Sequence, residues 1–274
     1  MSLLPTRSPG TLLLSALSAL TALLCLPATV AAQGFSAFVS PPRFEVKLTP
    51  GKPTRLIVEV QHVGTQPGGY RFYTNDWTLS PEHSVSFTDA LVPGSCRPWV
   101  AIERRELTLN PGNRYRYRFE ITPPANTPLG ECRFALMIEG RDAAQMQGPV
   151  PQVGGRIGVI VYASVGDASP DLVVTGSRVL LREGKPLAVI DVRNNGLAHG
   201  RLDGIVNGTD ANGNKIELAP ADLPILPNET RSISLNPVAA AGLPAPDPRF
   251  PLRVTGQLES GNQRLPLDLQ FSTP

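Results

Sequence analysis

Hydrophobic and polar residues alternate with a period of two along much of this chain. The clearest case is the segment 114–121, where Tyr115, Tyr117, Phe119 and Ile121 fall on one face and charged residues on the other. This alternation is typical of a β-strand with one face in a core and the other in water. No stretch of useful length has the 3.6-residue period of an amphipathic helix. The pattern therefore predicts an all-β protein.

A first series of short strands is predicted before residue 166, with Pro-Gly turns between them. The expected strands are 43–48, 54–63, 70–79, 84–87, 99–103, 114–121, 131–139 and 156–164. Strands spaced at about 8–12 residues are typical of a β-sandwich.

A second series follows the small-residue segment 165–170, which has the composition of a linker. Its expected strands are 172–181, 187–193, 200–208, 215–218, 231–235, 252–259 and 264–271, and the Ala- and Pro-rich span 236–251 is expected to be a loop. We therefore expect two sandwich domains, at 33–166 and 170–274, each long enough to bury its own core.

The composition supports this fold class. The chain of 274 residues contains 29 proline and 25 glycine residues, about one residue in five. Because both residues interrupt helices and favour turns, this content excludes a helical bundle or a coiled coil. Hydrophobic residues make up 41% of the chain, close to the globular average, which argues against intrinsic disorder.

Residues 1–32 have the layout of a secretory signal peptide. Arg7 lies in a short N-terminal region, the segment 11–27 is apolar and uncharged, and small residues follow up to Ala32. This layout predicts export, with cleavage near Gln33.

Two membrane-bound alternatives fit the same segment less well. Pro27 ends the apolar run before the roughly 20 residues that a spanning helix needs. A lipid-modified Cys25 is the other alternative, but Leu24 stands where a small residue is normally needed. The sequence favours an exported protein.

The net charge after export is close to zero. The whole chain carries 25 basic and 23 acidic side chains, a net charge of +2, and one of the basic residues lies within 1–32. Because affinity for phosphate backbones depends on summed positive charge, this balance argues against a nucleic-acid partner.

Two cysteines, Cys96 and Cys132, remain after removal of residues 1–32. In an exported protein such a pair is expected to be joined, and only one pairing is possible. The closed loop of 37 residues would contribute about 4 kcal/mol to the free energy of unfolding. Zinc is the alternative, but two distant cysteines without a nearby histidine supply at most half of its ligands. The sequence favours a structural disulfide and no metal.

The three histidines, His62, His83 and His199, lie in no recognised catalytic motif. His62 ends an apolar strand stripe, His83 lies in a turn, and His199 precedes a strand. We therefore expect no catalytic residue, no cofactor and no small-molecule substrate, and the protein is not expected to be an enzyme. A hydrolase would need a Ser, His and Asp cluster that only the fold could assemble.

The segment 210–214 resembles the start of a calcium-binding loop. Lys215 replaces the glycine that such a loop requires, and Ala221 takes the place of its final glutamate ligand. Asn212 followed by Gly213 between two alternating stretches is typical of a β-hairpin turn, which the pattern favours.

Three arginines, Arg114, Arg116 and Arg118, share the polar face of the segment 114–121. Such a row could bind a carboxylate or a phosphate through bidentate hydrogen bonds. A solvated outer face that discourages aggregation is the simpler interpretation, and the sequence favours it.

The first predicted domain carries short motifs in a characteristic order. They are Val39-Ser-Pro-Pro-Arg-Phe-Glu-Val46, Leu48-Thr-Pro-Gly51, Asn75-Asp-Trp77, Trp99, Leu107-Thr-Leu-Asn-Pro-Gly112, Ile121-Thr-Pro-Pro124 and Pro128-Leu-Gly-Glu131. In this order they resemble the periplasmic pilus-assembly chaperones of the PapD-like superfamily. The resemblance covers most of residues 36–165, and beyond Pro170 it rests on domain order and size.

The resemblance implies a periplasmic protein with two immunoglobulin-like β-sandwich domains in tandem. Members of the family bind secreted pilus subunits by lending them a β-strand. The implied partner is therefore a secreted pilus or surface-structure subunit, and an outer-membrane usher is a further candidate partner.

Family members hold the C-terminal carboxylate of the subunit with two basic residues in the interdomain cleft. The nearest candidates here are Arg43, from the first strand, and Arg156, from the last strand of the first domain. A stricter register would place Glu45 and Gly158 at these positions, and this alternative stays open.

The lending strand of the family carries alternating large apolar residues. Here the corresponding segment, 147–155, contains proline, which cannot donate a ladder hydrogen bond, and glycine, which has no side chain to insert. Ile157, Val159 and Val161, or their neighbours on the other face, remain as candidates for subunit binding. The chain is therefore expected to be a divergent relative whose client is not a conventional pilin.

The resulting hypothesis is a non-enzymatic periplasmic chaperone that pairs an edge strand near 154–164 with a secreted subunit and covers its apolar surface. The alternative is a structural or adhesive envelope protein of the same fold. That alternative needs no open edge strand and no basic cleft.

Overall fold

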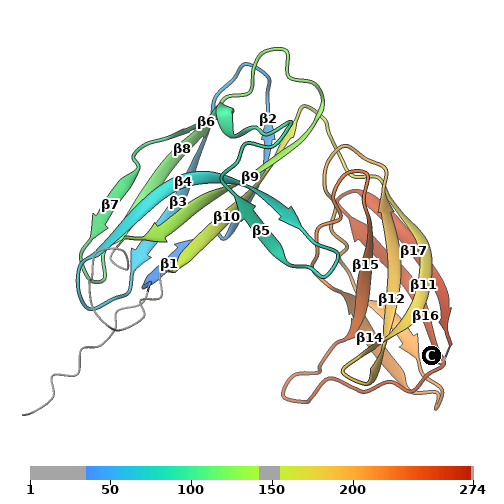
Figure 1. Cartoon of the computed structure of the whole chain (residues 1–274). Helices are drawn as coiled ribbons and strands as arrows, with labels where there is room; N and C mark the ends of the chain where they lie inside the picture. The colour runs from blue at the N-terminus through green and yellow to red at the C-terminus, as the bar shows by residue number, and fades with distance from the viewer. Residues whose placement is uncertain (1–34, 142–154, 273–274) are drawn as a thin grey trace, which may run out of the picture. The chain divides into compact units, whose positions relative to one another are not determined.

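The computed structural model describes residues 35–141 and 155–272. Within these ranges the chain forms strands and one turn of 3₁₀ helix, η2 (Arg97–Trp99), and no helix is long and apolar enough to span a membrane. The all-β prediction is confirmed (Figure 1). The predicted signal peptide lies outside the described residues, as does nearly all of 147–155.

Two sheets in the N-terminal half enclose the core of a first sandwich. One has the strand order β1-β3-β8-β6, and the other has the order β2-β10-β9-β4-β5, with β7 paired to β4. The strands are β1 (Ala37–Ser40), β2 (Arg43–Leu48), β3 (Thr54–His62), β4 (Gly68–Leu79), β5 (Val85–Thr88), β6 (Val100–Ile102), β7 (Glu106–Leu109), β8 (Arg114–Ile121), β9 (Gly130–Gly140) and β10 (Arg156–Val165).

The alternation of β8 places its apolar residues between the two sheets. Tyr117 and Phe119 are buried, whereas Arg116 and Arg118 are exposed on the outer face. Phe72 of β4 stacks on the ring of Tyr117 across the sandwich, with centroids 3.9 Å apart and the planes 7° from parallel. These contacts join the two sheets through a single apolar core.

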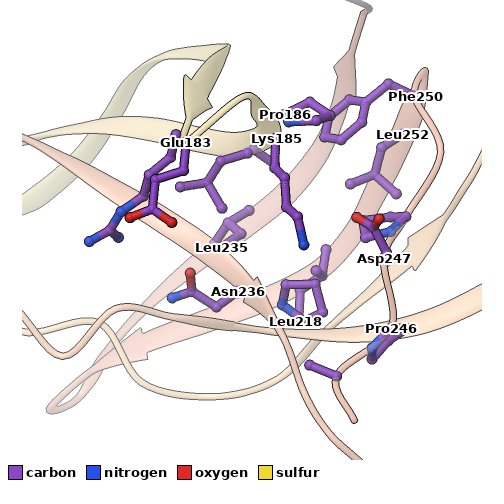
Figure 2. A pocket seen from close by; sticks show the side chains of 16 residues that line it. Glu183, Lys185, Pro186, Leu218, Leu235, Asn236, Pro246, Asp247, Phe250 and Leu252 are labelled. Atoms are coloured by element: carbon purple, nitrogen blue, oxygen red, sulfur yellow. The ribbon is translucent and has the colours of Figure 1, made fainter.

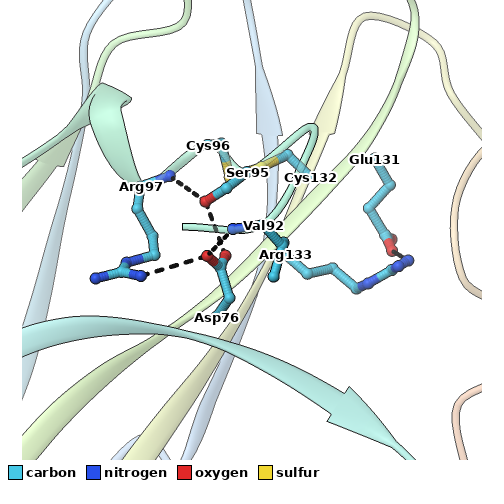
Figure 3. Close-up of a disulfide and its surroundings, with 8 residues drawn as sticks. All are labelled: Asp76, Val92, Ser95, Cys96, Arg97, Glu131, Cys132 and Arg133. Atoms are coloured by element: carbon cyan, nitrogen blue, oxygen red, sulfur yellow. Dashed lines mark hydrogen bonds and ion pairs between the residues drawn. A yellow bond between two sulfur atoms is a disulfide. The ribbon is translucent and has the colours of Figure 1, made fainter. Parts of the chain in front are cut away.

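The predicted disulfide is confirmed. Cys96, next to η2, is bonded to Cys132 of β9, with Cα atoms 5.9 Å apart (Figure 3). The buried carboxylate of Asp76 accepts hydrogen bonds from Ser95 Oγ at 2.8 Å and from Arg97 Nη1 at 3.3 Å. The η2 segment is therefore fastened to the sheet by a covalent bond and by a part-buried ion pair.

The C-terminal half forms a second sandwich from one sheet of order β11-β12-β15-β14-β13-β16-β17. The terminal strands β11 and β17 contact each other. Gln263 of β17 accepts a hydrogen bond from the backbone N–H of Leu172 at 2.8 Å and donates one to its carbonyl at 2.7 Å. The strands are β11 (Leu172–Arg182), β12 (Lys185–Asn194), β13 (Val206–Thr209), β14 (Lys215–Pro220), β15 (Thr230–Pro237), β16 (Leu252–Ser260) and β17 (Gln263–Phe271).

Three strand predictions need correction. The strand expected at 200–208 shrinks to β13, because Gly204 has a φ of +107° and only isolated bridges form at Gly200 and Asp203. Two further strands of four residues each, β1 and β7, were not predicted.

The segment 210–214 is the turn between β13 and β14. Asp210 Oδ1 accepts hydrogen bonds from the backbone N–H groups of Asn212 and Asn214, and Gly213 has a φ of +81°. The hairpin interpretation is therefore confirmed, and the Asp210 carboxylate is used within the turn.

Candidate functional site

Strand β10 has a partner along its whole length on one side only. β9 pairs with residues 156–165, whereas β2 pairs in parallel with residues 160–165 alone. Among residues 35–141 and 155–272, no strand lies beside 156–159 on the side of β2. The edge expected over 154–164 is thus shorter than predicted, because β2 covers its second half. Residues 156–159 are called the open edge below.

The backbone groups of the open edge alternate in direction. Gly140 donates its N–H to the carbonyl of Gly155 at 3.1 Å, so Gly155 points toward β9. Ile160 donates its N–H to the carbonyl of Pro42 at 3.4 Å, so Ile160 points the other way, toward β2. Because direction alternates along a strand, Arg156 and Gly158 present their N–H and C=O groups to the open side.

The apolar candidates of β10 face the core. Val159 and Val161 are fully buried in the first sandwich, and Ile157 packs partly buried against the same core. The backbone of Val161 is also flanked by strands on both sides, opposite Phe44 of β2 and Phe134 of β9. These side chains therefore hold β10 in the sandwich, and what they leave for a partner is the backbone of its first half.

The opposite face of β10 is covered at Gly158 by an aromatic ring. A Cβ added at Gly158 would lie 2.5 Å from the ring of Phe87 in β5 and 3.2 Å from Met137 Sδ. Phe87 and Met137 belong to an outer apolar cluster that also contains Trp77 and Tyr162. A larger residue at this position would have to displace the ring of Phe87, which occupies the space of a side chain.

The two predicted carboxylate anchors, Arg43 and Arg156, do not come together. Arg43 lies opposite Ile160 in the β2–β10 ladder. Arg156 is four residues earlier on β10, which corresponds to about 13 Å along the strand. Arg156 instead lines a cavity of about 260 Å³ with Arg71 and Tyr73.

Arg43 faces a second guanidinium, that of Arg201 in the segment between β12 and β13. Arg43 Nη1 lies 3.3 Å from Asp222 Oδ2, and Arg201 Nη1 lies 2.7 Å from Asp222 Oδ1. Glu45 Oε1 lies 3.2 Å from Arg43 Nε and 3.6 Å from Arg201 Nε. These four side chains, with charges that cancel, are called the arginine clamp below.

The geometry of the arginine clamp favours an ionised Asp222. Burial alone would raise the pKa of Asp222, but hydrogen bonds from Arg201 and Arg43 outweigh it and lower the pKa below its usual value. Arg201 and Asp222 were not predicted from the sequence, because each lies in an irregular segment of the second sandwich with no motif around it. The stricter register that placed Glu45 at the anchor position had identified a residue of this group.

A buried histidine lies next to the clamp. His199 stacks on Tyr162 with centroids 3.7 Å apart, and its backbone N–H donates to Glu131 Oε2 at 2.9 Å. The imidazole Nδ1 of His199 contacts the same oxygen at 2.5 Å. Burial would raise the pKa of Glu131, but the hydrogen bonds from His199 and the charge of Arg133 hold it below its usual value. This contact connects the start of β9 to the second sandwich.

The other histidines have structural contacts. His62 is buried, with Nδ1 2.5 Å from Tyr70 Oη and Nε2 2.6 Å from the carbonyl of Gln66. His83 lies in a turn with a φ of 67°. In the described ranges, no group of three or more His, Cys, Asp or Glu side chains could hold a metal ion.

A cavity of about 340 Å³ lies entirely within the second sandwich. Figure 2 shows Lys185 and Asp247 beside the apolar side chains of Leu218, Leu235 and Phe250 that line it. No residue of β2 or β10 contributes to its lining, so this cavity is separate from the open edge and from the arginine clamp.

No protein-family model and no curated protein sequence matches this chain. Solved structures that are similar to it include chaperones of fimbrial assembly. The class 5 fimbriae chaperone CfaA has 13% sequence identity and a TM-score of 0.48, over 87% of this chain and 99% of its own. The E. coli chaperone DraB has 13% identity and a TM-score of 0.44, over 86% and 100%. The chaperone SafB, in complex with the Salmonella enterica pilin SafA, has 11% identity and a TM-score of 0.46, over 87% and 99%.

These sequence identities and TM-scores do not indicate what the chain binds. Because the identities are this low, what the chain binds has to be inferred from the geometry of its own open edge and arginine clamp.

Proposed function

We propose that this protein is a non-enzymatic periplasmic chaperone that binds an extended segment of a secreted pilus-type subunit at the open edge. The observation that carries this proposal is the half-covered strand β10. An unpaired strand edge in a buried, rigid sheet is a template for β-strand addition, in which backbone hydrogen bonds supply affinity. Covering a subunit segment in this way would prevent it from pairing with other chains.

The position of β2 fixes where and how a client strand would end. β2 begins at Arg43, in the same position beside β10 that a client strand would occupy next to 156–159. A client that runs parallel to β10 would therefore finish with its C-terminus against Arg43. A guanidinium at that place can neutralise a terminal carboxylate through charge-assisted hydrogen bonds.

The open edge is too short to bind a client through the backbone alone. Arg156 and Gly158 offer two N–H and two C=O groups, and four hydrogen bonds of about 0.5–1.5 kcal/mol each amount to roughly 2–6 kcal/mol. Even before the cost of association this corresponds to a Kd of about tens of micromolar at best, and that cost weakens the affinity further. Client side chains and the terminal carboxylate must supply the remainder.

The backbone of Arg156 provides the test. In Arg156→Pro the outward N–H is lost, while the ladder with β9 uses the neighbouring residues, and proline is tolerated at the first residue of a strand. Arg156→Ala is the matched control, because it removes the side chain and keeps the N–H. We expect a pull-down of the secreted subunit encoded beside this protein to succeed with Arg156→Ala and to weaken about 2- to 12-fold with Arg156→Pro, as the loss of one hydrogen bond predicts.

Two outcomes would contradict the proposal. Equal capture by both variants would show that the open edge does not bind the subunit. Failure of the unaltered protein to retain any neighbouring secreted protein would argue against a chaperone altogether. Thermal unfolding of both variants checks that the sandwich is intact.

The second candidate is a structural or adhesive envelope protein. The pairing of β2 with residues 160–165 favours it, because a protein of this second kind needs no open edge strand. The unpaired backbone at 156–159 favours the chaperone, and the pull-down separates the two.

A further inference from the structure

The arginine clamp already holds a carboxylate. Asp222 accepts from Arg201 through Oδ1 and from Arg43 through Oδ2, so each oxygen is bound by one guanidinium. Two arginines that share the two oxygens of one carboxylate form the arrangement expected of a carboxylate-binding site. Asp222 therefore stands where an external carboxylate would be bound.

We propose that Asp222 is an internal competitor that occupies the carboxylate site until a client C-terminus displaces it, and that Arg201 is the second arginine of that site. This inference rests on the proposed function, because the client terminus arrives at Arg43 only if the client strand pairs with the open edge. The inference places Arg201 of the second sandwich in the binding site. It also means that the client carboxylate binds by displacing Asp222.

The charge balance of the clamp requires exchange rather than addition. Arg43 and Arg201 carry two positive charges, which Glu45 and Asp222 neutralise. A further carboxylate beside two bound carboxylates would be repelled, so it has to replace one of them. Replacement leaves the net charge of the site unchanged.

Asp222 is the carboxylate that can leave. Its side chain is 69% exposed, compared with 46% for Glu45, and it lies in the loop between β14 and β15. Glu45 is instead fixed within β2. Ion pairs this exposed contribute little to stability, so the loop can release Asp222 at small cost.

Arg201 is held ready for the exchange. Its side chain is only 17% exposed, it lies over the ring of Tyr162, and its Nη2 is 3.4 Å from Tyr162 Oη. Its buried Nε makes no hydrogen bond within the described residues, because Glu45 Oε1 at 3.6 Å is too distant. A guanidinium packed in this way keeps its position when its carboxylate partner changes.

Asp222→Asn tests the competition directly. N-acetylglycine serves as the probe for a peptide C-terminus, and N-acetylglycinamide is its neutral counterpart; binding is followed by NMR titration of the full-length exported protein. We expect Asp222→Asn to bind N-acetylglycine about 3- to 10-fold more tightly than the unaltered protein, since two exposed ion pairs no longer compete. Asp222→Ala should give at least the same gain, and Arg201→Gln should abolish it in the Asp222→Asn background.

A matched control comes from the second sandwich. Asp268, whose side chain is 66% exposed, pairs with Arg253 at 3.1 Å away from the clamp, so Asp268→Asn should leave the affinity unchanged. Equal or weaker binding of N-acetylglycine by both Asp222 variants would overturn the inference, as would equal binding of the neutral amide.

The two proposals can fail separately. If Arg156→Pro prevents subunit capture while the Asp222 variants show no gain, the chaperone function stands and the competitor does not. If the Asp222 variants gain affinity but no subunit is captured, the carboxylate site stands without the proposed function.

Discussion

The two sandwiches differ at the edges of their sheets. In the first, β10 has no neighbour beside 156–159 among the described residues. In the second, β11 and β17 contact each other, and Gln263 hydrogen-bonds both backbone groups of Leu172. An unpaired edge invites a strand from another chain, and contact between the two end strands of the second sheet hinders such pairing there. The proposed strand addition therefore belongs to the first sandwich, and the second sandwich contributes Arg201 and Asp222 from its loops to the arginine clamp.

Removal of the disulfide should give the largest difference in stability between the two sandwiches. We expect Cys96→Ala combined with Cys132→Ala to lower the free energy of unfolding of the first sandwich by about 2–5 kcal/mol, because the 96–132 loop is no longer closed in the unfolded chain. Both tryptophans of the chain, Trp77 and Trp99, lie in the first sandwich, so their fluorescence during denaturation reports on its unfolding.

Hydrogen exchange in β15 provides the control for this prediction, since it reports on the second sandwich. Its protection should change little in the cysteine variant. An equal loss of protection in both sandwiches would show that they unfold as one cooperative unit. The two sandwiches would then not differ in stability.

The fold could be predicted from the sequence wherever a pattern is local. Segment 114–121 alternates strictly and became β8, and the single possible cysteine pair formed the disulfide. The strand predicted at 200–208 was wrong over most of its length. Only isolated bridges form there, and the positive φ of Gly204 interrupts the ladder. Strand β1 was not predicted, because its alternation extends over only four residues before two prolines.

The site was less predictable than the fold. Arg43 was identified through its motif, yet its ion-pair partner Asp222 is 179 residues away in the sequence. Arg201 and Asp222 have no periodic context, so only the three-dimensional structure could bring them together. The open edge was located on the correct strand, but its length depended on how far β2 extends beside β10.

Gln263 tests the closure of the second sandwich with an intermediate effect. Gln263→Leu leaves the N–H and C=O of Leu172 without their partner, and we expect a loss of about 1–3 kcal/mol in the free energy of unfolding of the second sandwich. The opened seam between β11 and β17 should also promote self-association, measured by light scattering. Gln257→Leu, at an exposed position of β16, is the matched control. A variant that stays monomeric and stable would show that the seam is closed by packing alone.

The smallest effect is expected in acid and concerns Glu131, the buried carboxylate at the start of β9. Its pKa in the folded protein is lowered, so it binds its proton less readily when folded than when unfolded, and its stabilisation is present above the unfolded pKa and is lost as pH falls through the folded one. Glu131→Gln should therefore lower stability at neutral pH and make the decline in stability below about pH 4.5 shallower. Denaturant unfolding followed by tryptophan fluorescence measures this slope. Because His199 of the second sandwich is the hydrogen-bond donor, His199→Ala should flatten the same slope, and a steep decline in both variants would place the acid sensitivity elsewhere.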